Sequence, residues 1–316
     1  MKQKTSLGTD HVPIMQTFTI TDLPDLDVCV VASLEALSAQ KLPSSHFPSY
    51  KRPLVIGSGN AAATGKILFH DCDAVFADES SYVEKLEKIK DIDGVILISA
   101  SGGKHAPGIA KNVQQWDKPF YLLTNNPNSI AARSLSPKQI LVFPKNREPY
   151  TYNVSTYMSM ILAKTREDPK KILDFITTTI DSIALPDFSS YGAFCVIIPP
   201  QFLEIKEMLD KKFVELFGRK IAYTISTPEF MKHATTVVSR PDELFISFGY
   251  DNTQWGKHRL AIPLPPTADY AAMMAIGYYL IGKIQKANHP WFKESIAAYC
   301  KESSKIFGQD VQPIVE

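Results

Sequence analysis

The sequence has almost no charge bias and no long apolar run. Its 316 residues include 34 Lys and Arg against 33 Asp and Glu, which gives a formal net charge of +1 at pH 7. This balance provides no overall attraction to nucleic acid or to an anionic membrane, so we expect neither as a partner. No stretch approaches the roughly 18 uninterrupted apolar residues of a membrane-spanning helix, and residues 1–10 lack the apolar core of a signal peptide. We therefore expect a cytoplasmic protein.

Cysteine is also scarce, and its four positions are Cys29, Cys72, Cys195 and Cys300. They lie far apart, form no Cys-x-x-Cys pair and have no histidine nearby at the spacing of metal ligands. We expect no metal site. The cysteines are interpreted as small, buried apolar residues in a reducing compartment.

Short apolar runs alternate with stretches that can be helical. The runs in the first half are Leu54–Ile56, Gly94–Ile98, Phe120–Thr124 and Gln139–Phe143. The helical stretches beside them are Ala61–Phe69, Ser80–Lys90, Ala106–Trp116, Ser129–Leu135 and Tyr152–Lys164. Continuous apolar runs are typical of strands buried on both faces, and their alternation with helices predicts a parallel sheet.

The same pattern starts again in the second half. Its apolar runs are Ala193–Ile198, Ile221–Ile225, Leu244–Phe248 and Leu260–Leu264, with an amphipathic helix expected over Gln201–Phe217. We predict an α/β protein with two tandem domains, each a mostly parallel sheet flanked by helices. The predicted bounds are 50–168 and 185–316, with a helix at Asp174–Ile183 leading across. Residues 1–49 form an N-terminal helical extension with one helix at Leu34–Gln40.

The loop after the second apolar run, Ser99-Ala-Ser-Gly-Gly-Lys104, is suited to bind an anion. A loop that leaves the carboxyl end of a parallel strand and opens a helix directs backbone N–H groups and the positive helix end at one point. Ser99 and Ser101 add hydroxyl donors, and Lys104 adds a positive charge. The alternative is a Ser- and Gly-rich turn that only caps the next helix.

The first strand also ends in a glycine loop, Gly57-Ser-Gly59. It is a poor dinucleotide fingerprint, because Ala62 stands at the third glycine position, and Asp73 and Asp78 lie only 11 and 16 residues after that position, closer than the roughly 20 residues that the fingerprint needs. The sequence contains no Gly-x-x-x-x-Gly-Lys-Ser/Thr loop either. We therefore expect no nucleotide cofactor.

The order of these motifs resembles that of a sugar isomerase (SIS) domain over about residues 50 to 165. The matching features are Gly57-Ser-Gly-Asn60, Ser99-Ala-Ser-Gly102, Thr124-Asn125, Ser129-x-Ala131, Glu148 and Ser155-Thr156. Two such domains in tandem resemble the phosphoglucose/phosphomannose isomerases and the isomerase half of glucosamine-6-phosphate synthase. The resemblance implies that the sugar phosphate is bound by Ser58, Asn60, Ser99, Ser101, Lys104 and Ser155.

The sequence departs from this family at three positions of the phosphate site. Ala61 stands where the family has a serine, and Ala100 stands where it has a glutamine or a similar polar residue. Lys104 occupies the position of a phosphate-binding threonine. Two phosphate contacts are therefore missing. Either the charge of Lys104 compensates for them, or the pocket accepts a different ligand.

Aldose–ketose interconversion needs a group that opens the sugar ring and a base that moves a proton between adjacent carbons. The resemblance implies Glu215 as the base and His233, within a Lys-His pair, as the ring-opening group. Their interval, 233 − 215 = 18 residues, is slightly longer than in the family. Taken alone, Glu215 could be a carboxylate on the wet face of a charged helix, and His233 a loop or cap residue.

In the family the histidine comes from the neighbouring subunit, which implies a homodimer. The apolar helix expected over Tyr270–Lys286 resembles the long final helix of these isomerases. The family also uses a lysine of its C-terminal tail, and the resemblance implies Lys293, or alternatively Lys301, as this third catalytic residue.

The sequence thus predicts a phosphosugar aldose–ketose isomerase that uses an enediol mechanism without metal or organic cofactor. Three alternatives remain at this point: a non-catalytic sugar-phosphate sensor, a lyase or deaminating isomerase on amino sugar phosphates, and an interaction module.

Overall fold

The computed structural model describes residues 11–40, 42–43 and 47–316. Its first sheet contains β1 (Pro53–Ile56), β2 (Val75–Ala77), β3 (Gly94–Ile98), β4 (Phe120–Thr124) and β5 (Ile140–Val142). All neighbouring strands pair in parallel, in the order β2-β1-β3-β4-β5. The four strands expected from the sequence are present. The edge strand β2 was not expected, because it has three residues and two of them are only half-buried.

The second sheet contains β7 (Ala193–Ile197), β8 (Ala222–Ser226), β9 (Glu243–Phe248) and β10 (His258–Ile262). It is also parallel throughout, in the order β10-β9-β7-β8. The predicted α/β class with two parallel sheets is therefore confirmed.

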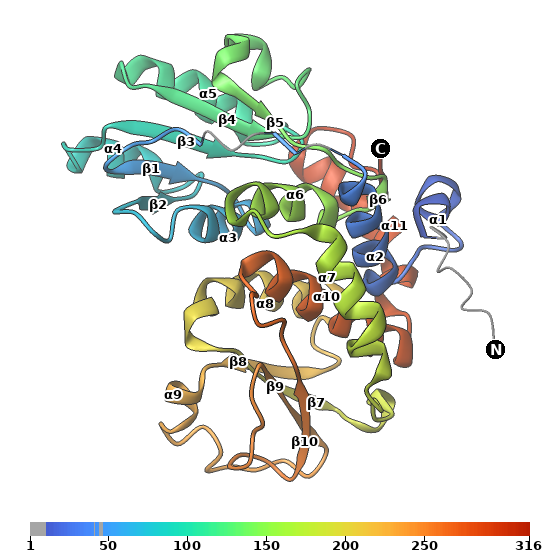
Figure 1. Ribbon diagram of the computed structural model, residues 1–316. Helices are drawn as coiled ribbons and strands as arrows, with labels where there is room; N and C mark the ends of the chain where they lie inside the picture. Colours follow the sequence, from blue (N-terminus) through green and yellow to red (C-terminus); the bar gives the residue numbers. More distant parts are fainter. Residues whose placement is uncertain (1–10, 41, 44–46) are drawn as a thin grey trace.

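Four helices lie between the two sheets: α3 (Asn60–Leu68), α6 (Val154–Thr165), α8 (Lys206–Phe217) and α10 (Tyr270–Ala287) (Figure 1). Every residue from Tyr270 to Gly282 is buried, because α10 is apolar on all sides and has neighbours all round. One continuous hydrophobic core includes residues of both sheets and of these helices. The two halves are thus joined by shared packing.

The outer faces of the sheets are covered unequally. Helices α4 (Tyr82–Lys88) and α5 (Ala106–Val113) cover the outer face of the first sheet with a second apolar cluster. In the part of the chain that the structure describes, the outer face of the second sheet carries a small cluster around Cys195, with the short helix α9 (Pro228–Met231) and loops beside it (Figure 1).

The N-terminal segment is part of this core. Helices α1 (His11–Thr17) and α2 (Leu26–Ser38) precede the first sheet, and α7 (Pro169–Thr178) with a short 3₁₀ turn after it leads to the second. The prediction of one helix at Leu34–Gln40 was wrong in its start, because α2 begins eight residues earlier. Helix α2 packs on α10 so closely that a Cβ on Gly282 of α10 would lie 2.1 Å from the backbone nitrogen of Asp27 in α2. The domain bounds remain a prediction.

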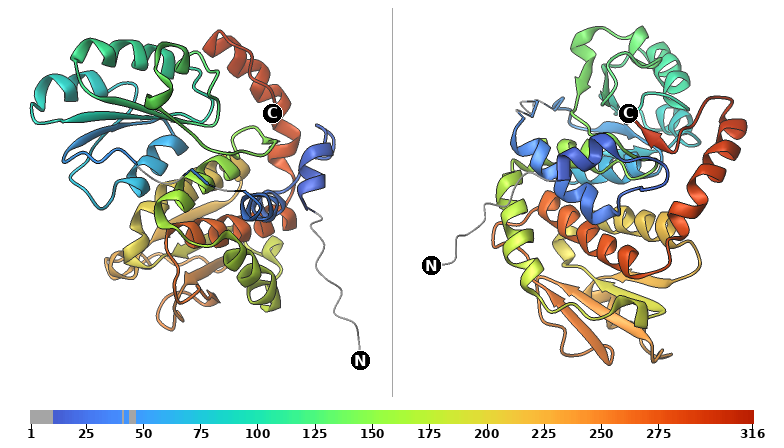
Figure 2. Two further views of the ribbon diagram at one scale, coloured as in Figure 1. Left: turned by 45° about the horizontal axis from the view of Figure 1, so that its top comes forward. Right: turned by 90° about the vertical axis from the view of Figure 1, so that its right-hand side faces the viewer.

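The C-terminal segment returns to the first half. Helix α11 (Trp291–Phe307) runs along the side of the molecule past both halves (Figure 2). Residues 308–316 then turn back, and β11 (Ile314–Val315) pairs antiparallel with β6 (Glu148–Pro149). The final residue, Glu316, forms an ion pair of 2.8 Å with Arg147.

Two other helix predictions need correction. The stretch Ser129–Leu135 forms only a 3₁₀ turn at Ala132–Ser134, because the backbone becomes extended at Leu135, two residues before Pro137. The helix predicted over Gln201–Phe217 becomes regular only at Lys206, after a 3₁₀ segment that begins at Pro200. Among the described residues, no helix combines the length and apolarity that crossing a membrane requires.

Candidate functional site

The strand order of the first sheet determines where a ligand can bind. Strands β1 and β3 are neighbours, but the chain leaves β1 toward β2 on one side and leaves β3 toward β4 on the other. Loops at such a switch point diverge at the carboxyl ends of the strands and leave a crevice. A cavity of about 330 Å³ lies there, lined by the loop after β1 and the loop after β3.

The loop after β3 has the geometry of an anion-binding loop. The Ser99 hydroxyl accepts the Gly102 N–H at 3.2 Å, and the Ser101 hydroxyl accepts the Gly103 N–H at 3.3 Å. Each hydroxyl still has its own proton to donate. Gly102 has a φ of +61° and its Cβ position would lie 2.2 Å from the Ser129 hydroxyl, so only glycine fits. Helix α5 begins just after this loop, and its N-terminus adds a positive field.

Lys104 lines the same cavity but makes its contacts with aromatic rings. Its ammonium donates to the Tyr150 hydroxyl at 2.6 Å and lies 4.5 Å from the centre of the Phe307 ring. Burial lowers the pKa of Lys104, because loss of water around the ammonium disfavours its charged form. An anion in the cavity would stabilise that charge.

Asn60, at the start of α3, connects the first half to the second. Its amide nitrogen donates to the Glu215 carboxylate at 3.3 Å, which fixes the orientation of the amide group because a carboxylate can only accept. The amide oxygen is buried and has no hydrogen-bond partner. An orphaned buried acceptor that lines a cavity is suited to a ligand hydroxyl. Ser58 lines the cavity too, and its hydroxyl donates to Glu79.

Glu215 reaches this cavity from α8 in the second half. Its second carboxylate oxygen accepts from the ammonium of Lys212, which is fully buried and also donates to the Thr151 carbonyl at 2.7 Å. The side chain of Glu215 keeps 22% of its surface exposed. Glu215 is therefore held by an amide and an ammonium while remaining accessible from the cavity.

Thr151 is a site residue that the sequence did not indicate. Its φ of +76° is rare for a β-branched residue, and its buried hydroxyl has no partner. Strain and an orphaned polar atom in one cavity-lining residue point to a function there. His105 beside Lys104 also lines the cavity and was not predicted. The other polar or aromatic lining residues that sequence reasoning missed, with one valine, are Tyr150, Asn153, Tyr157, Tyr299 and Val315. These last five carry no motif, because three segments distant in the sequence contribute them.

Three predicted site residues lie outside this cavity. Ser155 is buried, and its hydroxyl accepts the Asn146 N–H at 2.7 Å. Lys293 is on α11 rather than in a tail, and it forms an ion pair of 2.8 Å with Asp25. His233 is exposed in the turn after α9. The alternative, Lys301, is exposed on α11 and does not line the cavity.

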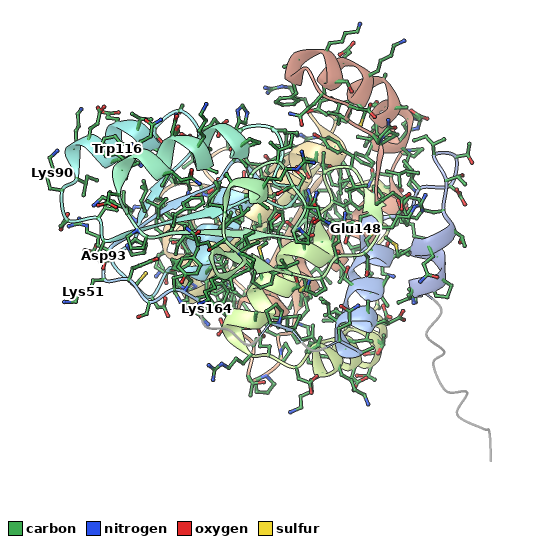
Figure 3. The ribbon with its side chains drawn as sticks, turned by 90° about the horizontal axis from the view of Figure 1, so that it is seen from above. Lys51, Lys90, Asp93, Trp116, Glu148 and Lys164 are labelled. Atoms are coloured by element: carbon green, nitrogen blue, oxygen red, sulfur yellow. The ribbon has the colours of Figure 1, made fainter. Side chains whose placement is uncertain are left out.

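Glu148 explains the burial of Ser155. It lies in the interior beside the first turn of α6 (Figure 3), where it accepts the N–H groups of Val154 at 2.6 Å and Ser155 at 2.7 Å. Burial raises the pKa of Glu148 above that of an ordinary glutamic acid, although these hydrogen bonds and Lys212 oppose the shift. The conspicuous Glu148 and Ser155 pair is therefore a helix cap. In the described residues, no three His, Cys, Asp or Glu side chains gather as a metal site.

Comparison with solved structures identifies the architecture. Tagatose-6-phosphate ketose/aldose isomerase from Escherichia coli superposes with a TM-score of 0.58 and 12% identity, over 77% of this chain and 84% of that one. The chain has the tandem SIS fold. No family model matches the sequence, and no curated protein matches it either.

Two further structures share the tandem SIS fold. The C-terminal domain of glucosamine-fructose-6-phosphate aminotransferase from Francisella tularensis gives a TM-score of 0.56 at 13% identity, over 83% of this chain and 93% of that one. Glucosamine-6-phosphate deaminase from Thermotoga maritima gives 0.55 at 12% identity, over 87% of this chain and 94% of that one. At these identities the likeness concerns the fold, and function has to be argued from the site.

Proposed function

We propose that this protein is an aldose–ketose isomerase of sugar 6-phosphates. The observation that carries the proposal is that Glu215 lines the same cavity as the loop Ser99–Lys104. A phosphate would be bound at one end of the cavity by this loop, and a carboxylate base would be available at the other. That is the pair of functions that the isomerisation of a phosphosugar requires.

In the proposed mechanism the open-chain sugar lies with its phosphate against Ser99, Ser101 and the N-terminus of α5. Glu215 removes a proton from one of the two carbons at the reacting end, C1 or C2, and returns it to the other through an enediol. Lys212 and Asn60 hold Glu215 in place. The free amide oxygen of Asn60 accepts a sugar hydroxyl. No metal or organic cofactor takes part in these steps.

The ring-opening group is proposed to be His233 of a second copy. Within one chain His233 is exposed and outside the cavity. Val237 and Val238 nearby are 78% and 88% exposed, and Phe230 is 61% exposed. Apolar side chains exposed together mark an interaction surface. A homodimer in which this segment reaches the other subunit's cavity would complete the site.

Proton exchange tests the proposal. Fructose 6-phosphate incubated with the protein in deuterated water should lose its C1 proton signal, whereas Glu215→Gln should bind the sugar equally well and exchange it slower by a factor of about 10² or more. Glu207→Gln is the matched control on the same helix, because Glu207 pairs with Lys66 outside the cavity.

A non-catalytic sugar-phosphate sensor is the alternative, and Ala61 and Ala100 favour it. Both line the cavity with methyl groups where the SIS resemblance implies polar contacts. A sensor would bind fructose 6-phosphate and exchange no proton, in wild type as in Glu215→Gln. That result would reject the isomerase and retain the phosphosugar site.

A further inference from the structure

The reacting end of an open-chain ketose presents two different groups to a base. C1 carries a hydroxyl group, whereas the carbonyl oxygen at C2 can only accept hydrogen bonds and becomes negatively charged as the enediolate forms. A complete site around Glu215 therefore needs an acceptor for the hydroxyl and a donor for the carbonyl oxygen. The free amide oxygen of Asn60 is the acceptor. The donor has to come from another side chain of the cavity.

Several donors near Glu215 are directed at oxygens of the protein itself. The amide nitrogen of Asn60 donates to the carboxylate of Glu215 at 3.3 Å. The ammonium of Lys212 donates to the same carboxylate and to the Thr151 carbonyl. The amide of Asn153 also donates to this carbonyl, at 3.3 Å. These groups hold the base and the backbone in place, and none of them is aimed at a substrate oxygen.

Two tyrosines of the cavity lie on the side of Lys104. The Tyr150 hydroxyl accepts from the Lys104 ammonium at 2.6 Å, and the centre of the Tyr299 ring lies 6.3 Å from that of Tyr150. Tyr299 is also 52% exposed, so bulk water competes for its hydroxyl. Both belong to the part of the cavity where the phosphate would be bound.

Tyr157 is the remaining tyrosine of the cavity lining. It is on α6, and Glu215 is on α8, two of the helices that lie between the sheets (Figure 1). Only 5% of the surface of Tyr157 is accessible. Among the described residues its hydroxyl has no hydrogen-bond partner, and it is not one of the fully enclosed polar atoms either. An unpartnered, accessible hydroxyl on a buried residue that lines the cavity is open to a ligand there.

The surroundings keep Tyr157 protonated. Burial raises the pKa of Tyr157, and the negative charge of Glu215 raises it further. The phenol therefore remains a hydrogen-bond donor while Glu215 is ionised and ready to act as a base. Thr151 has the other unpartnered hydroxyl of the lining, but a phenol is more acidic than an alcohol and is the stronger donor to an oxyanion.

We propose that Tyr157 is a catalytic residue whose hydroxyl donates a hydrogen bond to the carbonyl oxygen of the open-chain sugar and stabilises the enediolate. This inference rests on the proposed function, because it takes Glu215 as the base. A neutral donor fixed where negative charge develops stabilises the transition state more than the ground state, as in an oxyanion hole. Tyr157 thus has a role that neither Glu215 nor His233 performs.

The reaction with Tyr157 as donor is balanced in protons and electrons. The C1–H bond breaks, its proton goes to the Glu215 carboxylate, and its electron pair forms the double bond between C1 and C2. The carbonyl electrons move onto the C2 oxygen, which accepts the hydrogen bond of Tyr157. The proton of the C1 hydroxyl then passes to this oxygen, and Glu215 returns its proton to C2 as the C1 carbonyl forms. Tyr157 keeps its own proton throughout.

Tyr157→Phe tests this role, because it removes only the hydroxyl. In deuterated water this variant should exchange the C1 proton of fructose 6-phosphate slower than wild type by a factor of about 10², the usual effect of losing one donor to an oxyanion. Calorimetry should show nearly unchanged affinity for fructose 6-phosphate, because the hydrogen bond strengthens only as the enediolate forms.

Tyr278→Phe is the matched control. Burial and the charge of Glu215 raise the pKa of Tyr278 too, so this phenol shares the electrostatic surroundings of Tyr157. Its hydroxyl, however, donates to the Met208 carbonyl at 3.4 Å, and Tyr278 does not line the cavity. Tyr278→Phe should exchange the C1 proton at the rate of wild type.

A second ligand separates a catalytic hydrogen bond from a structural effect. The compound 5-phosphoarabinonohydroxamate has the same phosphate as fructose 6-phosphate and a planar hydroxamate where the enediolate would form. We expect Tyr157→Phe to weaken its binding by about 10- to 100-fold, the range for a hydrogen bond to a charged group. A merely structural role of Tyr157 would weaken the binding of both ligands alike.

The possible failures are distinguishable. Exchange by Tyr157→Phe at the wild-type rate, or an equal loss of affinity for both ligands, would overturn the inference and leave the proposed function intact. Thr151→Val keeps the branched shape and removes the other free hydroxyl. If this variant loses exchange and hydroxamate binding while Tyr157→Phe keeps them, the donor is Thr151 and the inference is wrong. A wild-type protein that exchanges no proton would overturn the proposed function and the role of Tyr157 with it.

Discussion

Lys212 and Glu215 stand one helical turn apart on α8 and form an ion pair in which the lysine side chain is completely buried. The ammonium also binds the Thr151 carbonyl, and the carboxylate also binds the amide of Asn60. One pair thus connects α8 in the second half to α3 and the segment before α6 in the first. The same contacts that join the two halves position the proposed base.

Replacing Lys212 should therefore affect stability and catalysis together. We expect Lys212→Met to lower the free energy of unfolding by about 3 kcal/mol, because removal of one partner leaves a largely buried charge unpaired. Urea denaturation measures this, and deuterium exchange at C1 should fall in parallel. The double variant Lys212→Met/Glu215→Gln should regain much of the stability and none of the exchange. If Lys212→Met is as stable as wild type, the pair does not join the halves.

We expect Lys104 to contribute to phosphate binding rather than to the stability of the fold. Its ammonium is held by Tyr150 and Phe307 at the cavity, within reach of an anion at the Ser99–Ser101 loop. We expect Lys104→Ala to weaken binding of fructose 6-phosphate by about 1.5–3 kcal/mol, the value of a charge-assisted hydrogen bond. Calorimetry measures the difference. Lys111→Ala, an exposed lysine on α5 outside the cavity, is the control, and equal affinities of both variants would remove Lys104 from the site.

Glu148 should make stability depend on pH. Burial raises its pKa in the folded protein above the ordinary value of about 4.3, so the folded state binds more protons than the unfolded state between these two values. This contribution to stability is complete below about pH 4.3 and is lost as the pH rises through the folded pKa. The unfolding free energy of wild type, taken relative to that of Glu148→Gln, should therefore decrease as the pH rises. A difference that is constant with pH would contradict the raised pKa.

Mixing two inactive variants tests the proposed dimer. Glu215→Gln and His233→Ala each remove one contribution to a shared site, so each homodimer should be inactive. If the site takes Glu215 from one chain and His233 from the other, half of a remixed sample forms heterodimers with one intact site of two. About a quarter of wild-type exchange activity should then return. An inactive mixture that light scattering and mass spectrometry show to contain heterodimers would reject the shared site.

The sequence by itself determined the strands that are continuous and apolar. Gly94–Ile98 and Phe120–Thr124 were predicted to the residue, because a strand buried on both faces needs apolar side chains at every position. It also indicated a tight loop at Ser99–Lys104, since glycine allows the positive φ that Gly102 adopts and serine hydroxyls accept nearby backbone N–H groups. Weak local signals failed: β2 is short and half-buried, and α2 begins well before the helix that was expected.

Only the tertiary structure decided which residues share the site. Asn60 and Glu215 are 155 positions apart and meet because α3 and α8 pack between the two sheets. Ser155, which resembles a phosphate ligand in sequence, is buried beneath its helix cap instead. No local sequence pattern indicated Thr151, because its positive φ and its unpaired buried hydroxyl are properties of the folded chain. Sequence patterns report local burial and loop chemistry, whereas a site between two halves depends on the packing of segments distant in the chain.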